Sequence, residues 1–220
     1  MRSRLLVAPL ALLLAAPVLL AAHQARPAPY GDRFTLHARV EYAGGPRPRT
    51  TRAVVTAYAP ESGRLHWTHA RPGRRPLEVL PVRGHVIALW DDGLVTDTGS
   101  EGVRWHRAVP GAADRPRAGA RGRALRLLGP RMLAVVTPGR VTAYRLADGD
   151  LRWVLPAREG CAFEPGRAVR RGPALLVAQP CTTDGTSDPD PDAPWTSQLV
   201  AVDDLGRITP DRRPLGNDLP

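Results

Sequence analysis

The chain has 220 residues, a length that allows one or two domains with a sizeable hydrophobic core. Its 24 prolines and 21 glycines argue against a helical protein and favour many short strands joined by turns, while recurring apolar runs exclude a disordered chain. The formal net charge is +10, but all 31 Lys or Arg positions hold arginine, which is typical of GC-rich coding, and we expect no nucleic-acid partner.

The first 25 residues predict a membrane anchor or an export signal. Arg2 and Arg4 precede an uncharged, mostly aliphatic run over residues 5–22. At about 1.5 Å per residue this run is just long enough to cross about 30 Å of hydrocarbon, and the basic residues before it would stay inside. We therefore expect a single-pass protein of the cell membrane with an extracytoplasmic domain; a cleaved signal with a secreted product and a buried core helix are the alternatives. Residues 26–33 are expected to be a linker.

A phrase of thirteen residues occurs twice in the chain. "VTAYAPESGRLHW" at 55–67 returns as "VTAYRLADGDLRW" at 141–153. Each copy alternates apolar and polar residues, breaks at a glycine (Gly63 or Gly149) and then alternates again. A period of two on both sides of a glycine predicts two strands joined by a tight turn.

The repeated phrase belongs to a unit of about 45 residues that recurs four times between residues 34 and 210. Each unit has an apolar strand followed by a hairpin, as at Asp92-Gly93 and Pro138-Gly139. About four strands per unit is typical of β-propeller blades. The sequence predicts an all-β propeller of about four blades, closed as a small ring or open as a partial arc. One N-terminal hydrophobic helix would precede it and a tail over 211–220 would follow. Short additional strands are expected at 77–82, 124–128 and 166–170.

The unit ends "AYAPESGRLHW" and "AYRLADGDLRW" resemble the tryptophan-docking motif of quinoprotein-type (PQQ-like) β-propeller repeats. The resemblance implies that Trp67, Trp105 and Trp153 pack between adjacent blades, with Gly63 and Gly149 in the turns before them. It is weaker in the second unit, "TDTGSEGVRW", and the fourth unit lacks the tryptophan.

This resemblance leaves more than one function open. Enzymes of the family bind the quinone with a calcium ion, but the acidic, amide and adjacent-cysteine groups that they use cannot be placed in this chain. Non-enzymatic members act as scaffolds in envelope assembly or as extracellular sensor domains. We therefore expect a protein-binding or self-associating scaffold without catalysis or cofactor. A quinoprotein-like oxidoreductase formed from paired half-propellers and a sensor for a small ligand are the alternatives.

The chain contains two cysteines, Cys161 and Cys181. Outside the cytoplasm such a pair predicts a disulfide, and two free thiols are the alternative.

Two of the hairpin turns are expected to be long and oppositely charged. One covers 43–52 and the other 181–197. Their charged residues could meet between two copies of the chain, or both turns could be simple surface insertions. The first turn carries Arg47, Arg49 and Arg52, and the second carries Asp184, Asp188, Asp190 and Asp192.

The remaining polar groupings do not predict a catalytic, cofactor-binding or metal site. The alternating aspartates at 188–192 lack the glycine and the distal glutamate of an EF-hand loop. His66 and His69 would point to opposite faces of a strand, and His85 and His106 stand isolated on other strands.

Overall fold

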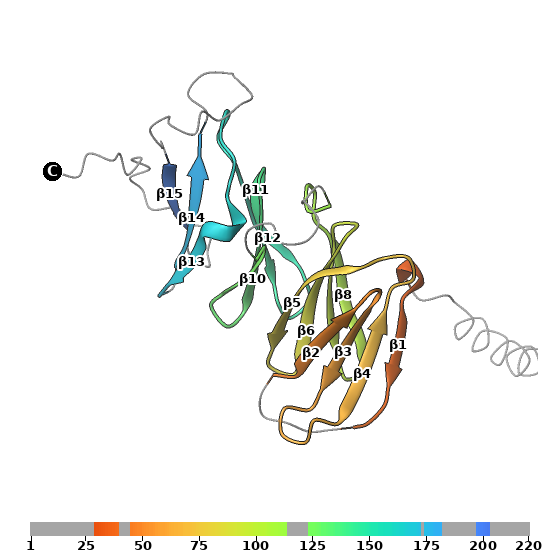
Figure 1. Cartoon of the computed structure of the whole chain (residues 1–220). Helices are drawn as coiled ribbons and strands as arrows, with labels where there is room; N and C mark the ends of the chain where they lie inside the picture. The colour runs from red at the N-terminus through yellow and green to blue at the C-terminus, as the bar shows by residue number, and fades with distance from the viewer. Residues whose placement is uncertain (1–28, 40–44, 114–122, 173, 182–196, 203–220) are drawn as a thin grey trace, which may run out of the picture.

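The computed structural model describes residues 29–39, 45–113, 123–172, 174–181 and 197–202 (Figure 1). These residues form four antiparallel sheets and two short 3-10 segments, η1 (Pro29–Gly31) and η2 (Pro165–Arg167). No helical segment within these ranges is long and apolar enough to span a membrane. The predicted all-β class is confirmed, and the hydrophobic run over 5–22 lies outside the described residues.

The four sheets follow one another along the chain. The N-terminal sheet has the order β1-β4-β3-β2, from β1 (Arg33–Leu36), β2 (Arg47–Thr51), β3 (Val54–Tyr58) and β4 (Leu65–Ala70). The second contains β5 (Pro76–Val82), β6 (His85–Trp90), β7 (Leu94–Gly99) and β8 (Gly102–Ala108). The third contains β9 (Leu125–Leu128), β10 (Met132–Thr137), β11 (Arg140–Arg145) and β12 (Leu151–Pro156). The C-terminal sheet contains β13 (Ala168–Arg171), β14 (Ala174–Pro180) and β15 (Ser197–Val202).

A shared irregularity shows that the sequence repeat is also a backbone repeat. In each of the first three sheets the ladder shifts register directly after the pair that contains the motif tryptophan. These pairs are Ala57–Trp67, Asp97–Trp105 and Ala143–Trp153. A β-bulge at one position strengthens the local twist of the strands, and its recurrence gives the three sheets the same shape. The sheets are therefore successive blades of a β-propeller.

The N-terminal sheet differs from the predicted unit. The sequence pattern assigns the first apolar strand to the segment around Leu36 and a long turn to 43–52, but β1 pairs with β4, and β2 pairs with β3. The turn prediction is therefore wrong for residues 47–51. Thr50 and Thr51 are β-branched and favour a strand, and Pro48 is tolerated because β2 lies at the edge of the sheet.

Apolar side chains fill the space between neighbouring sheets. Trp67 packs with Val86 and Ala88 between the first two sheets. Separate clusters join the second sheet to the third, around Ile87 and Leu133, and the third to the C-terminal sheet, around Leu175. Each blade is thus held by its neighbours in the row.

The row of blades is an open arc. In Figure 1 the N-terminal sheet (β1–β4) and the C-terminal sheet (β13–β15) lie at opposite ends of the row. Of the two predicted arrangements, the structure has the partial arc and not the closed ring. Each terminal sheet consequently has one face that no other described sheet covers.

The uncovered face of the N-terminal sheet is polar and basic. Strand pairing places Arg49, Thr56, Thr68 and Thr35 in one row across all four strands on this face. Neighbouring rows add Arg47 and Tyr58, Thr51 and Val54, and Ala70 and Arg33. We call this surface the basic end face.

The uncovered face of the C-terminal sheet has a different composition. Val169 and Leu176 face each other across β13 and β14, and Val169 is 54% exposed. Arg171 and Ala174 form the next pair on the same face, and Arg171 is exposed. The two ends of the arc are therefore chemically unlike.

Candidate interaction site

A buried group of charged side chains joins the N-terminal and second sheets. We call it the junction cluster, and its members are Asp32, His69, Arg71, Asp92 and His106. The Nε2 atoms of His69 and His106 donate to Oδ2 of Asp32 at 3.0 and 2.8 Å. Nε of Arg71 donates to Oδ1 of Asp32 at 3.0 Å, and its two terminal nitrogens donate to both oxygens of Asp92 at 2.9 and 3.0 Å. Because Asp32 immediately precedes β1, the cluster fixes the entry of the chain into the propeller.

The two carboxylates of the junction cluster are paired with N–H donors of histidine and arginine. Burial alone would raise the pKa of the Asp32 carboxyl, but hydrogen bonds from His106 and His69 and the charge of Arg71 hold that pKa well below its usual range. The pKa of Asp92 is lowered as well, because the bidentate bond from Arg71 outweighs burial. Both carboxylates are therefore ionised and fully used as acceptors for the surrounding donors.

One part of the cluster has the connectivity of a hydrolase triad. The hydroxyl of Thr98 lies 2.9 Å from Nδ1 of His69, whose Nε2 bonds to Asp32. In serine hydrolases Nε2 faces the hydroxyl and Nδ1 faces the carboxylate, the reverse of this arrangement. Thr98 and His69 are 1% and 0% exposed, so no substrate can reach them. The arrangement holds two blades together and is not an active site.

Aromatic rings close the junction cluster on its outer side. Tyr30 has φ 61°, which is uncommon for a residue other than glycine, and its ring centroid lies 5.0 Å from that of His106. The guanidinium carbon of Arg71 lies 5.8 Å from the Tyr30 ring and 5.2 Å from the Trp90 ring. The end of the predicted linker is therefore packed onto the blades.

A smaller cluster joins the second sheet to the third. Nδ1 of His85 and Oδ1 of buried Asp97 are 2.5 Å apart, and Arg104 donates to Oδ2 of the same aspartate at 2.9 Å. Arg104 also donates to the carbonyl of Ala147 in the β11–β12 turn at 3.1 Å. His85 and His106, isolated in the sequence, are therefore both paired with aspartates.

The motif tryptophans occupy unlike environments. Trp105 donates to the carbonyl of Leu146 at 3.0 Å and covers Gly149, where an added Cβ would lie 2.6 Å from the indole. This contact joins the second blade to the β11–β12 turn of the third. Trp67 packs instead on β6, and Trp153 is partly buried beside the core between the last two sheets. An added Cβ on Gly63 would meet nothing within 4 Å.

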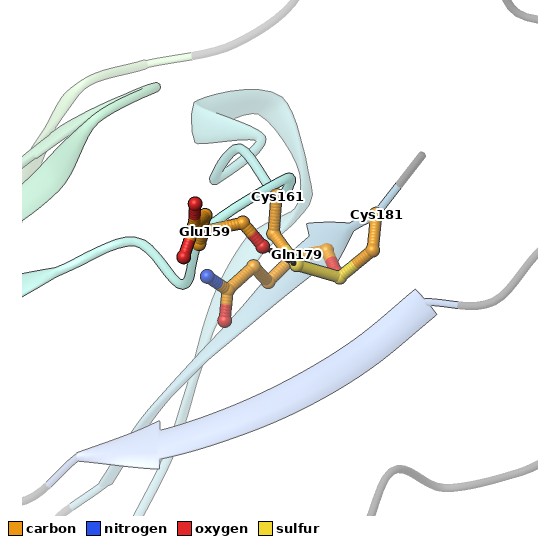
Figure 2. The surroundings of a disulfide bond; sticks show 4 residues. All are labelled: Glu159, Cys161, Gln179 and Cys181. Atoms are coloured by element: carbon orange, nitrogen blue, oxygen red, sulfur yellow. Dashed lines mark hydrogen bonds between the residues drawn. A yellow bond between two sulfur atoms is a disulfide. The ribbon is translucent and has the colours of Figure 1, made fainter. Parts of the chain in front are cut away.

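The predicted disulfide is confirmed. Cys161 and Cys181 are bonded to each other, and no free cysteine is present in the described residues. Figure 2 shows the bond between the segment that follows β12 and the end of β14, with Glu159 and Gln179 beside it. It therefore links the connection from the third sheet to a strand of the C-terminal sheet.

Of the two predicted charged turns, only the arginines of the first lie in the described part of the chain. Arg47 and Arg49 are exposed on β2, and Arg52 is exposed in the turn that follows. Asp184, Asp188, Asp190 and Asp192 lie outside the described residues. Their proposed contact between two copies of the chain stays a prediction.

Two large apolar side chains are exposed on the outer edge of the third sheet. β12 is the last strand of its sheet in the described residues, and its Leu151 and Val154 are 57% and 42% exposed. An unpaired strand edge can accept an added strand, and exposed apolar residues beside it give such a contact affinity. We call this surface the β12 edge.

Within the described residues, no group of three or more histidine, cysteine, aspartate or glutamate side chains is arranged to hold a metal ion. The described surface instead offers a basic end face and the β12 edge, both carried by the sheets of the blades. Fold and surface together define a β-propeller arc.

The structural comparison agrees with this class. The chain is similar to the crystal structure of BamB from Moraxella catarrhalis, with a TM-score of 0.52 and 17% sequence identity over 81% of this chain. The match covers 52% of the BamB chain, so this chain spans about half of that protein's length. At this identity the likeness supports the fold alone. No protein-family model and no curated protein sequence matches the chain.

Proposed function

We propose that the protein is a scaffold that binds another protein outside the cytoplasm, held at the membrane by residues 5–22. The observation that carries this proposal is the β12 edge, where Leu151 and Val154 are exposed on a strand whose outer side is unpaired in the described residues. A partner strand added here would gain backbone hydrogen bonds from the edge and apolar contact from these two side chains.

Three further observations support the proposal. The unit ends resemble quinoprotein-type repeats, a family that includes non-catalytic scaffolds. The fold is similar to that of BamB. The disulfide between Cys161 and Cys181 fits an oxidising compartment. The quinoprotein-like oxidoreductase has no specific observation in its favour among the described residues.

The proposal is tested by photo-crosslinking in the native membrane. A benzophenone amino acid at Leu151 should give a defined crosslinked band, and the same probe at the exposed Arg131 of the β9–β10 turn should not. Adding Val154→Asp should remove the Leu151 band because the aspartate would have to lose its hydration in the contact. Equal crosslinking from both positions, or a band that survives Val154→Asp, would refute a site at the β12 edge.

A further inference from the structure

The basic end face is an unusual surface for the end of a row of packed blades. Much of the contact between blades is made by apolar side chains, as with Trp67 against Val86 and Ala88. On the basic end face the strand residues alternate so that Arg33, Thr35, Arg47, Arg49 and Thr51 are all exposed. Covering this face with another blade would remove its guanidinium groups from water without apolar gain. The composition of the face therefore favours contact with water or with a hydrated surface over contact with another blade.

The charge of this face is unbalanced. None of the four strands of the N-terminal sheet contains an aspartate or glutamate. Within the described residues, Arg33, Arg47 and Arg49 form no ion pair, whereas arginines in other blades do, such as Arg104 with Asp97 and Arg145 with Asp148. Arg49 lies over the ring of Tyr58, with its guanidinium carbon 5.2 Å from the ring centroid. Among the described residues, three guanidinium groups without a carboxylate partner thus share one sheet face with threonine hydroxyls.

The position of this face relative to the amino terminus is fixed by the junction cluster. Asp32 is anchored by His69, Arg71 and His106, and Tyr30 packs against His106, so the chain is fixed to the blades from Tyr30 onward. The linker between residue 22 and this point can extend at most about 25 Å. Arg33, which belongs to the basic end face, is the next residue after Asp32. The N-terminal sheet is therefore the blade nearest to the proposed membrane tether.

We infer that the basic end face docks onto the surface of the membrane that carries the protein, with its arginines on the phosphates of acidic lipids. This inference rests on the tether of the proposed function. Arginine recognises phosphate through paired N–H donors, and hydroxyls of threonine add further donors. The tether keeps the face at high local concentration beside the bilayer, so a contact of modest strength is sufficient.

A lipid surface fits this face better than a protein partner does. Protein interfaces are centred on exposed aromatic or aliphatic anchors that fill pockets. The one aromatic side chain of the described basic end face, Tyr58, is covered by Arg49. A basic surface without such an anchor matches an array of phosphates instead.

The test uses the full chain in nanodiscs of phosphatidylcholine alone or mixed equally with phosphatidylglycerol. An environment-sensitive fluorophore on Thr51→Cys reports contact of the basic end face with lipid, and Val169→Cys on the exposed side of β13 is the control position. We expect quenching by headgroup-labelled lipid at Thr51→Cys in the mixed discs only, and we expect high salt to remove it. Equal quenching at both positions, or equal quenching in both lipid compositions, would overturn the inference.

Two matched variants separate the face from the overall charge. Arg33→Gln, Arg47→Gln and Arg49→Gln together should lower the ratio of docked to free orientations about a hundredfold, since each arginine near an acidic surface contributes roughly fivefold. Removing the same number of charges from exposed arginines of the other three sheets or their turns should leave the ratio within about twofold. This control variant combines Arg83→Gln, Arg152→Gln and Arg171→Gln. Equal losses in the two variants would reject the basic end face as the docking surface.

Failure of the tether is distinguishable from failure of the docking. Alkaline extraction of native membranes shows directly whether the chain is held by a hydrophobic segment. If the chain is extracted, the tether of the proposed function is wrong, and flotation with acidic vesicles then tests the basic end face in the soluble protein. Flotation that is lost in the Arg33, Arg47 and Arg49 variant but not in the control supports the face. Absence of flotation by the unsubstituted chain refutes it.

Discussion

Replacing Asp32 with asparagine tests the junction cluster at its centre. The substitution keeps the shape of the side chain but removes the charge that accepts bonds from His69, Arg71 and His106. The amide nitrogen of the asparagine would also face the N–H groups of these residues, and two donors cannot form a hydrogen bond. A hydrogen bond to a buried charged group contributes about 1.5–3 kcal/mol, and loss of one partner from a buried ion pair costs about 3–5 kcal/mol. Because Arg71 keeps its bidentate bond to Asp92, we take the lower end, about 3 kcal/mol.

Calorimetry and urea unfolding measure this loss. For a domain of this size about 3 kcal/mol corresponds to a fall in Tm of about 6–12 °C. Asp148→Asn is the matched control: Asp148 also bonds to an arginine, Arg145, but both side chains are 42% exposed, and its Tm should be unchanged within error. A shift of less than about 2 °C for Asp32→Asn, or equal shifts for the two variants, would refute the view that the cluster holds the first two blades together.

The same pair of proteins gives a pH dependence whose sign follows from the lowered pKa of Asp32. The unfolded chain binds a proton at this carboxyl near pH 3.9, whereas the folded chain binds it only at lower pH. The contribution of Asp32 is therefore fully present above about pH 5 and is lost as the pH falls through about 4 toward the folded pKa. Asp32→Asn should flatten this part of the stability curve. An acid limb of equal slope in both proteins would contradict the assignment.

Two further predictions concern contacts between blades. Gly149→Ala should lower the Tm by several degrees more than Gly63→Ala. Both glycines have positive φ (69° and 64°), but only a Cβ at Gly149 would meet the Trp105 indole. Equal effects of the two substitutions in differential scanning calorimetry would argue against that contact. Replacing both Cys161 and Cys181 with alanine opens a loop of about twenty residues and should lower the free energy of unfolding in urea by about 3 kcal/mol. A reductant should have no effect on this variant. A variant as stable as the parent would show that the disulfide does not stabilise the fold.

The strands and turns inside the blades could be read from the sequence because they depend on local patterns. Alternation and the pair Asp92-Gly93 identify the hairpin between β6 and β7, and the repeated phrase shows that the unit recurs. The disulfide followed from the number of cysteines and the expected compartment. These signals come from residues close together in the chain or from general rules about composition.

The junction cluster could not be read in this way. His106 and Asp32 are 74 positions apart, and nothing near either residue identifies its partner. The one available signal was the presence of His69 and Arg71 beside buried positions of an apolar strand, since buried polar groups require partners. The pairing of β1 with β4, and of β2 with β3, was not predicted for a related reason. A short alternating segment has the same sequence pattern whichever strand it pairs with.

The unlike ends of the arc also limit how copies of this protein could assemble. A head-to-tail array would place the C-terminal end of one copy, with Val169, Leu176 and Arg171, against the arginines and threonines of the next. Such a junction would remove guanidinium groups from water at every step, which disfavours open-ended fibres. Pairing two basic end faces across a two-fold axis would remove guanidinium groups from water on both sides, so this face is disfavoured as a direct contact between copies in either arrangement.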